Sequence, residues 1–192
     1  MFPAAGRKED GIPEMGQTVY TIGHSTRTIE EFISLLKENG IELLVDIRTI
    51  PKSRYNPQFA SESLEKSLTS AKINYEYMRP LGGLRHTTKD SINLGWRNDS
   101  FRGFADYMQT EEFDEAIKNL IEMSEKTRLV IMCAEAVPWR CHRSLVSDAL
   151  TVRGVDVVHI MGRGKNSVHK ITPFAKVEGV RVFYPSIEQS LF

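Results

Sequence analysis

The sequence predicts one α/β domain of the three-layer, Rossmann-like kind, in which helices cover both faces of a mostly parallel sheet. Short apolar runs rich in β-branched residues alternate along the chain with longer segments whose apolar residues recur at helical spacing. Parallel neighbours need a return of helix length, and such crossovers are right-handed. With 192 residues, 41% of them hydrophobic, the chain can bury the core that this fold requires.

Gly and Pro residues separate the expected helices and strands along the chain. Thr28 is placed to cap the first helix, Gly40 to end it, and Gly154 to end the last. A long stretch over 80–104 lacks periodicity and is expected either to close over a site as a lid or to pack onto the domain. The tail over 167–184 could add a hairpin at one edge. The expected elements are strands over 18–22, 41–47, 74–78, 129–132 and 155–160, and helices over 29–39, 61–71, 104–126 and 141–153.

The amino-acid composition limits the class of protein and the cellular compartment that we expect. Residues 1–16 carry Gly, Pro and charge without periodicity, so we expect a flexible N-terminal leader followed by a single domain over 17–192. Lys plus Arg equals Asp plus Glu at 25 each, so no global field attracts nucleic acid or an anionic membrane. We see neither a membrane span nor an export signal and expect a cytoplasmic protein, in which Cys133 and Cys141 are reduced thiols.

Reactive and charged side chains follow three of the expected strands, at the point where each strand ends. The carboxyl ends of parallel strands lie along one edge of a sheet, and ligands bind in the crevice outside that edge. We therefore expect these side chains to meet there. They are His24 and Ser25 after the first strand, Asp46 and Arg48 at the second, and Cys133, Glu135, Cys141, His142 and Arg143 between the fourth strand and its helix.

The residue types suggest catalytic roles. Cys133 precedes a helix start with cationic neighbours, which stabilise a thiolate, so it is a candidate nucleophile; the alternative is a small buried residue that ends a strand. His24, Asp46 and Glu135 are candidates for acid and base catalysis, because histidine titrates near neutrality and a carboxylate can orient it.

Other residues suggest anion binding. His142 and Arg143 lie in the first turn of a helix, where free N–H groups attract anions, and a cation placed there indicates a partner anion. Arg48 would be a second clamp, and Ser25 and Cys141 complete the expected ligand-binding set.

A second set of residues, over 52–59 and 75–86, interleaves cations with aromatic side chains. This pattern can bind single-stranded nucleic acid, and Arg54 and Tyr55 are included among the candidate ligand-binding residues. The alternative for Tyr75 and Tyr77 is packing in the core.

The chain ends in Leu191 and Phe192 after a Gln, which resembles peptides that dock into replication sliding clamps. The alternative is that these two residues pack back onto the domain.

Six short motifs stand out along the chain. They are Thr21-Ile22-Gly23-His24-Ser25, Val45-Asp46-Ile47-Arg48, Asn56-Pro57-Gln58-Phe59, Leu81-Gly82-Gly83, Cys133-Ala134-Glu135 and Cys141-His142-Arg143. These motifs resemble those of the family named domain of unknown function 488, over about 19–160. That resemblance implies a Rossmann-like fold, and members are sometimes labelled as DNA-repair or iron-sulfur assembly proteins.

Parts of the chain also resemble rhodanese-like domains. Arg140, however, falls seven residues after Cys133 where a rhodanese loop has six, and Pro138 interrupts the run.

The leading hypothesis is an enzyme of nucleic acid or nucleotide metabolism that acts on a phosphate-bearing ligand. The alternatives are a non-catalytic nucleic-acid-binding module, sulfur transfer through a Cys133 persulfide, and metal binding by Cys133, Cys141 and His142 with His24 or Glu135. The sequence does not identify a cofactor.

Overall fold

The computed structural model describes residues 17–186 of the 192-residue chain. The segment 1–16, expected to be a leader, and the clamp-like Leu191 and Phe192 lie outside the described residues. Within that described part, no helix combines the length and apolar character needed to cross a membrane.

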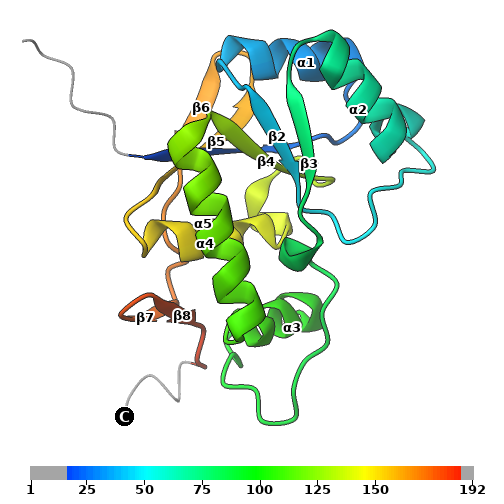
Figure 1. Ribbon diagram of the computed structural model, residues 1–192. Helices are drawn as coiled ribbons and strands as arrows, with labels where there is room; N and C mark the ends of the chain where they lie inside the picture. The colour runs from blue at the N-terminus through cyan, green and yellow to red at the C-terminus, as the bar shows by residue number, and fades with distance from the viewer. Residues whose placement is uncertain (1–16, 187–192) are drawn as a thin grey trace, which may run out of the picture.

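A six-stranded sheet forms the centre of the domain (Figure 1). Its strand order is β3-β2-β4-β1-β5-β6, and only the β5–β6 pair is antiparallel. β4 therefore lies between β1 and β2, although it follows both in sequence. The strands are β1 (Thr18–Gly23), β2 (Leu43–Asp46), β3 (Asn74–Tyr77), β4 (Leu129–Cys133), β5 (Asp156–Gly162) and β6 (Lys165–Val168).

Helices cover both faces of this sheet, as the sequence predicts. On one face α1 and α2 enclose an apolar cluster that includes Phe32, Leu64 and Ile22 of β1. On the other face the cluster includes Phe113, Leu145 and Ile131 of β4. The fold is therefore a three-layer α/β sandwich. The helices are α1 (Ile29–Glu38), α2 (Ser61–Ser70), α3 (Asp99–Tyr107), α4 (Glu111–Lys126) and α5 (Arg143–Thr151), with short 3-10 turns η1 (Pro57–Phe59), η2 (Arg79–Leu81) and η3 (Pro138–Arg140).

Local sequence explains where the first helix begins and ends. The Thr28 side chain accepts a hydrogen bond from the Glu31 N–H at 3.1 Å, which caps the start of α1. Gly40 follows the helix with φ of 64°, a left-handed conformation that glycine adopts without the cost of a Cβ clash.

The single helix predicted over 104–126 is wrong, because the structure has two helices there. α3 ends at Tyr107, and the Thr110 side chain accepts from the Phe113 N–H to start α4. The apolar spacing continues across the break since both helices pack on the same core.

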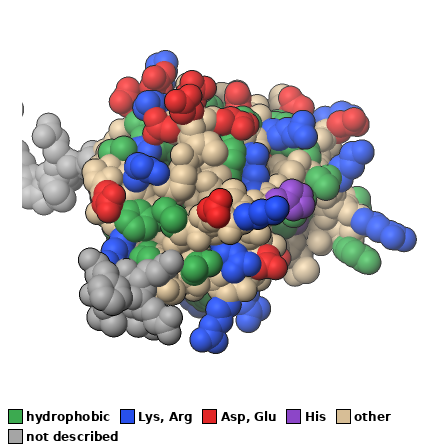
Figure 2. All heavy atoms as spheres, turned by 90° about the horizontal axis from the view of Figure 1, so that it is seen from below, with side chains coloured by type: hydrophobic (Ala, Val, Ile, Leu, Met, Phe, Trp, Pro, Cys, Tyr) green, Lys and Arg blue, Asp and Glu red, His purple; other side chains and the backbone are tan. Residues whose placement is uncertain are grey.

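The tail also differs from a simple edge hairpin. β6 adds to the main sheet beside β5, whereas β7 (Lys176–Glu178) and β8 (Arg181–Phe183) form a separate two-stranded sheet, drawn apart from the main sheet in Figure 1. On the face seen in Figure 2, both signs of charge are present and acidic side chains gather along the upper edge of the view, in keeping with equal numbers of cations and anions.

Candidate functional site

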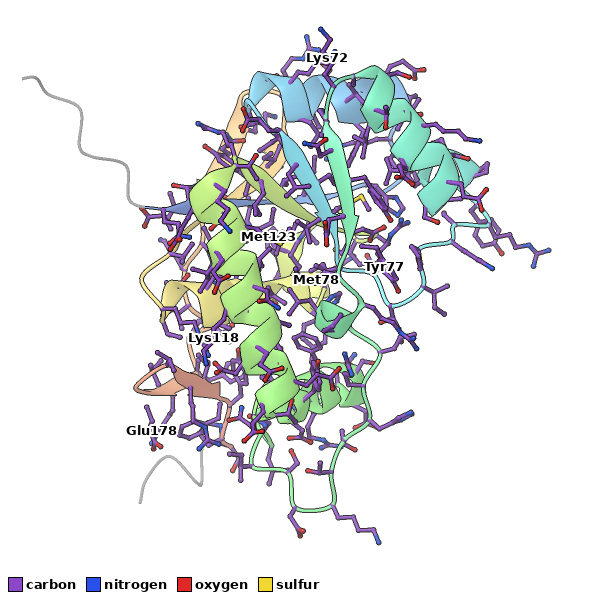
Figure 3. The ribbon with its side chains drawn as sticks, in the orientation of Figure 1. Lys72, Tyr77, Met78, Lys118, Met123 and Glu178 are labelled. Atoms are coloured by element: carbon purple, nitrogen blue, oxygen red, sulfur yellow. The ribbon has the colours of Figure 1, made fainter. Side chains whose placement is uncertain are left out.

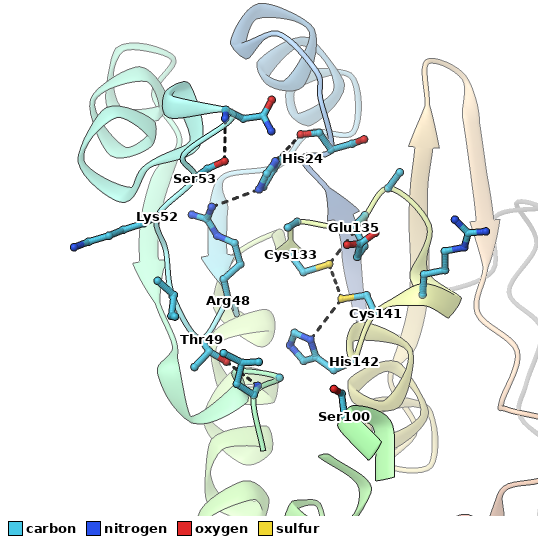
Figure 4. Close-up of a pocket in the computed structure, with 18 of the residues that line it drawn as sticks. His24, Arg48, Thr49, Lys52, Ser53, Ser100, Cys133, Glu135, Cys141 and His142 are labelled. Atoms are coloured by element: carbon cyan, nitrogen blue, oxygen red, sulfur yellow. Dashed lines mark hydrogen bonds between the residues drawn. The ribbon is translucent and has the colours of Figure 1, made fainter. Parts of the chain in front are cut away.

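A cavity of about 710 Å³ opens at the carboxyl ends of β1, β2 and β4 (Figure 4). Most of the residues predicted for the site line it, which confirms that these distant stretches meet at one edge of the sheet. The predicted residues in the lining are His24, Ser25, Arg48, Tyr55, Cys133, Glu135, Cys141 and His142.

Strand register brings these residues together. Gly23 at the end of β1 pairs with Cys133 at the end of β4, and the His24 N–H donates to the Cys133 carbonyl at 3.0 Å. A Cβ on Gly23 would lie 1.7 Å from the Glu135 carbonyl oxygen, so only glycine allows the loop after Cys133 to approach β1 this closely. Ser25 turns the chain from β1 toward α1 with φ of 51°, a left-handed conformation that is strained for serine.

His24 is a neutral imidazole at the cavity wall. Its Nδ1 lies 2.8 Å from the Ser25 carbonyl and donates to it, which leaves Nε2 as an acceptor, 3.5 Å from Arg48 Nη1. The ring stacks on Phe59 with centroids 4.4 Å apart. Burial lowers the pKa of His24, and the nearby Arg48 charge lowers it further, although the Ser25 hydrogen bond opposes both. Nε2 can therefore accept a proton from a bound ligand.

Asp46 is fully buried and holds Arg48 in place. Its carboxylate accepts from Arg48 Nε and Nη2, with a closest contact of 2.5 Å, and from the Tyr75 hydroxyl at 3.0 Å. These bonds turn the Nη1 edge of Arg48 toward His24. Asp46 does not belong to the described cavity lining, so the structure places it as a positioning residue for Arg48. Tyr75 reaches this carboxylate from β3 and packs, partly buried, against the apolar cluster under α1 and α2. Tyr77 is exposed and donates to the Thr49 carbonyl at 2.8 Å, so it is not a core residue.

Cys133 and Cys141 face each other at the cavity, with their sulfurs 2.7 Å apart (Figure 4). Both are free thiols in the structure. Burial opposes ionisation of Cys133, but the hydrogen bond from Cys141 and the positive charge of Arg143 outweigh it, so the pKa of Cys133 is lowered. Cys141 donates its proton to Cys133 and is buried, and both effects raise the pKa of Cys141 well above the ordinary value. The pair thus favours one shared proton, with the thiolate on Cys133.

Arg143 supplies the positive charge beneath this pair. Its side chain is 1% exposed, and Nη2 donates to the carbonyls of Glu135 and Ala136. Its Nε and Nη1 have no hydrogen-bond partner among the described residues. A buried cation without a carboxylate partner is costly, whereas a thiolate at Cys133 would compensate its charge. Arg143 therefore acts from below the cavity and does not belong to its described lining.

His142 connects Cys141 to the neighbouring strand. Its Nε2 donates to the Ile47 carbonyl at 3.1 Å, and its Nδ1 lies 3.5 Å from Cys141 Sγ. Burial lowers the pKa of His142 to about 4, so the ring is neutral and Nδ1 is an acceptor. Gly83 packs against this ring, where a Cβ would lie 2.4 Å from Nδ1.

The cavity entrance carries cations and aromatic rings. Lys52 and Arg140 line the cavity and were not in the predicted set. Lys52 begins the basic and aromatic stretch over 52–59, and Arg140 lies in the loop between the two cysteines. Tyr55 is 88% exposed at the entrance, and Arg54 beside it is exposed but outside the described lining. The position of Arg140 between the two candidate cysteines was the sequence feature that could have placed it in the site.

The stretch over 80–104 is packed onto the domain and also contributes to the cavity. Asp106 accepts from the Thr88 N–H, the Ser91 hydroxyl and the Asn93 amide, which fixes the middle of the stretch. Gly83, Leu84, Ser100 and Phe101 line the cavity.

No cluster of three or more His, Cys, Asp or Glu among residues 17–186 is arranged to hold a metal ion. The metal-binding alternative therefore has no ligand set in this part of the chain.

Comparison with known proteins identifies the family but not an activity. No curated protein and no solved structure matches the chain. Residues 28–150, more than half of the chain and within the range of the motifs above, match the model of the family described as "Domain of unknown function DUF488", and the chain belongs to this family.

Proposed function

We propose that the protein is a thiol-dependent enzyme in which Cys133 attacks a phosphate-bearing ligand of nucleotide size. The observation that carries this proposal is the Cys133–Cys141 pair at the cavity, with sulfurs 2.7 Å apart above the buried Arg143. A stabilised thiolate is the reactive form of cysteine, and cationic surroundings of this kind are typical of reactive cysteines.

Charge and size support a phosphate-bearing ligand. Lys52, Arg140 and Arg48 line a volume of about 710 Å³, within the range of ~300–1,000 Å³ that is usual for small-molecule sites. Arg48 can bind a phosphate oxygen through Nη1 while Asp46 holds its other nitrogens. Ligand charge would be bound at the entrance and the reacting atom placed next to Cys133.

Two other side chains have roles in this proposal. His24 Nε2 accepts a proton from the ligand or returns one to a leaving group. Glu135, exposed beside Cys133, is a second candidate for proton transfer.

Protection of Cys133 from alkylation tests the proposal. Iodoacetamide modification of Cys133 is followed by mass spectrometry with inorganic phosphate, nucleoside monophosphates and a short oligonucleotide as probes. We expect at least one probe to slow alkylation and to raise the melting temperature by roughly 5–11 °C at a hundred times its dissociation constant. The double variant Lys52→Gln/Arg140→Gln should lose both effects.

The control is Lys118→Gln, which removes an exposed cation on α4 outside the described cavity lining (Figure 3). It should behave as the wild type, since exposed ion pairs contribute ~0–1 kcal/mol. Absence of protection by every probe would remove the proposed ligand class. Catalysis is separated from binding by Cys133→Ser, which should keep the thermal shift and lose any turnover.

A second candidate function, nucleic-acid binding, is favoured by exposed aromatic rings near the cavity. Tyr55 is 88% exposed and Trp139 is 65% exposed, each next to an arginine in sequence. Rings that stack bases beside cations that bind phosphates are typical of single-strand sites. In this case the oligonucleotide would bind tightly with a steep salt dependence, and Cys133→Ser would leave the affinity unchanged.

A further inference from the structure

The proposed function uses Cys133 as the nucleophile and gives Cys141 only the supporting role of a hydrogen-bond donor. We propose that Cys141 is the resolving thiol of Cys133, so that the ligand's electrophilic atom is a sulfur and the site cycles through a Cys133–Cys141 disulfide. This inference rests on the proposed function and deepens it by naming the substrate class, an anionic compound with an electrophilic sulfur.

The geometry of the cysteine pair supports direct attack of Cys141 on the Cys133 sulfur. The sulfurs are 2.7 Å apart, closer than the ~3.5–4 Å at which non-bonded carbon atoms pack. The loop between the cysteines is held by η3 and by the bonds from Arg143 Nη2 to the carbonyls of Glu135 and Ala136. Two cysteines can be bridged without backbone movement only when they already lie close together, as these do.

His142 lies beside Cys141 but does not act as its base. Nδ1 lies 3.5 Å from Cys141 Sγ, and burial lowers the pKa of His142 to about 4, so the ring stays neutral. While Cys133 is a thiolate, Cys141 shares its proton with that sulfur. Once Cys133 carries an adduct, its sulfur no longer holds that charge, and the group that leaves as Cys141 attacks takes the proton.

A neighbouring thiol is useful for only some adducts. An adduct at carbon or phosphorus is released by water or another nucleophile at that atom, and an attacking thiol forms no disulfide with Cys133. An adduct at sulfur is a mixed disulfide, which a second thiolate cleaves by attack on the Cys133 sulfur. The cavity is also far larger than a peroxide requires, and its cations suit an anionic organic molecule.

The reaction sequence balances as two exchanges. The Cys133 thiolate attacks the substrate R–S–X at sulfur, the Cys133 S–S–R bond forms, and X leaves with the electron pair of the S–X bond. Cys141 attacks Cys133 Sγ, so that the intramolecular disulfide forms, and RS⁻ leaves and takes the Cys141 proton. The substrate sulfur is reduced, the thiol pair is oxidised, and an external dithiol restores the two thiols by the same exchange chemistry.

The test uses dithiobis(nitrobenzoate), an anionic aromatic disulfide, at one equivalent per chain of the full-length protein. We expect the wild type to release about two equivalents of thionitrobenzoate and to retain no label, with a Cys133–Cys141 disulfide found by peptide mapping. Cys141→Ser should release about one equivalent and retain one as a mixed disulfide on Cys133, removable by dithiothreitol. Cys141→Ala gives the same readout if the serine variant melts at a lower temperature.

Two results would overturn the inference while leaving the proposed function standing. One is a wild type that keeps the label on Cys133 while Cys141 stays free. The other is disulfide formation that is faster with hydrogen peroxide than with the anionic disulfide at equal concentration, which would replace sulfur by peroxide oxygen as the electrophile. A Cys133→Ser variant that reacts as fast as the wild type would instead show that Cys133 is not the reactive thiol, and the proposed function would fall with it.

Discussion

Substitution of Gly23 by alanine should disturb the thiol pair without touching either cysteine. The new Cβ would lie 1.7 Å from the Glu135 carbonyl oxygen and 3.1 Å from Ala136 Cα. Real Cβ atoms essentially never approach other atoms closer than 3.0 Å, so the carbonyl must move by about 1.3 Å. This oxygen accepts from Arg143 Nη2 at 3.3 Å, and a movement of that size breaks the bond.

Overpacking of this kind costs typically ~1–3 kcal/mol. For a domain of this size the melting temperature falls by roughly 2–4 °C per kcal/mol, so we expect a decrease of roughly 2–12 °C. We also expect slower reaction of Cys133 with iodoacetamide at pH 7, since Arg143 and the loop no longer support the thiolate.

Thermal melting and the alkylation rate measure the two effects. The matched control is Gly162→Ala at the end of β5, where a Cβ would have no neighbour within 4 Å among the described residues. If Gly23→Ala melts and reacts as Gly162→Ala does, the close approach of the loop to β1 does not support the site.

Two further predictions concern pH. Burial alone would raise the pKa of Cys133, but the Cys141 hydrogen bond and the Arg143 charge lower it, so alkylation should have its pH midpoint below the ordinary ~8.5. Cys141→Ala should move that midpoint upward and slow the reaction at pH 7 severalfold; an unchanged midpoint would contradict the shared proton. Burial also opposes ionisation of Asp106, but hydrogen bonds, of which that from Asn93 is the strongest, lower the pKa of its carboxyl group. The ionised carboxylate therefore stabilises the fold fully above the unfolded pKa of ~3.9, and this stabilisation is lost as pH falls through the folded pKa. Urea unfolding should show Asp106→Asn less stable by about 1.5–3 kcal/mol at pH 7, with the difference narrowing below about pH 4; a constant difference would mean that packing, not charge, is responsible.

The local pattern of apolar residues was sufficient to predict the three-layer α/β fold. Apolar runs such as 129–132 indicate strands covered on both faces, and the spacing of Phe32, Leu35 and Leu36 indicates a helix packed on one side. The break between α3 and α4 was missed because apolar residues keep helical spacing across it, whereas the cap at Thr110 depends on the path of the backbone.

By itself the sequence determined that reactive residues follow the strands and would meet at one edge, since parallel strands align their carboxyl ends. Tertiary structure decided which of them face the cavity. Asp46 ends β2 and Arg48 follows two residues later in the loop, where their side chains pair with each other. The insertion of β4 between β1 and β2 placed the strand that ends at Cys133 between the strands that precede His24 and Arg48, and the loop path set Cys141 against Cys133. Strand order and loop path arise from packing between distant segments, which local sequence does not encode.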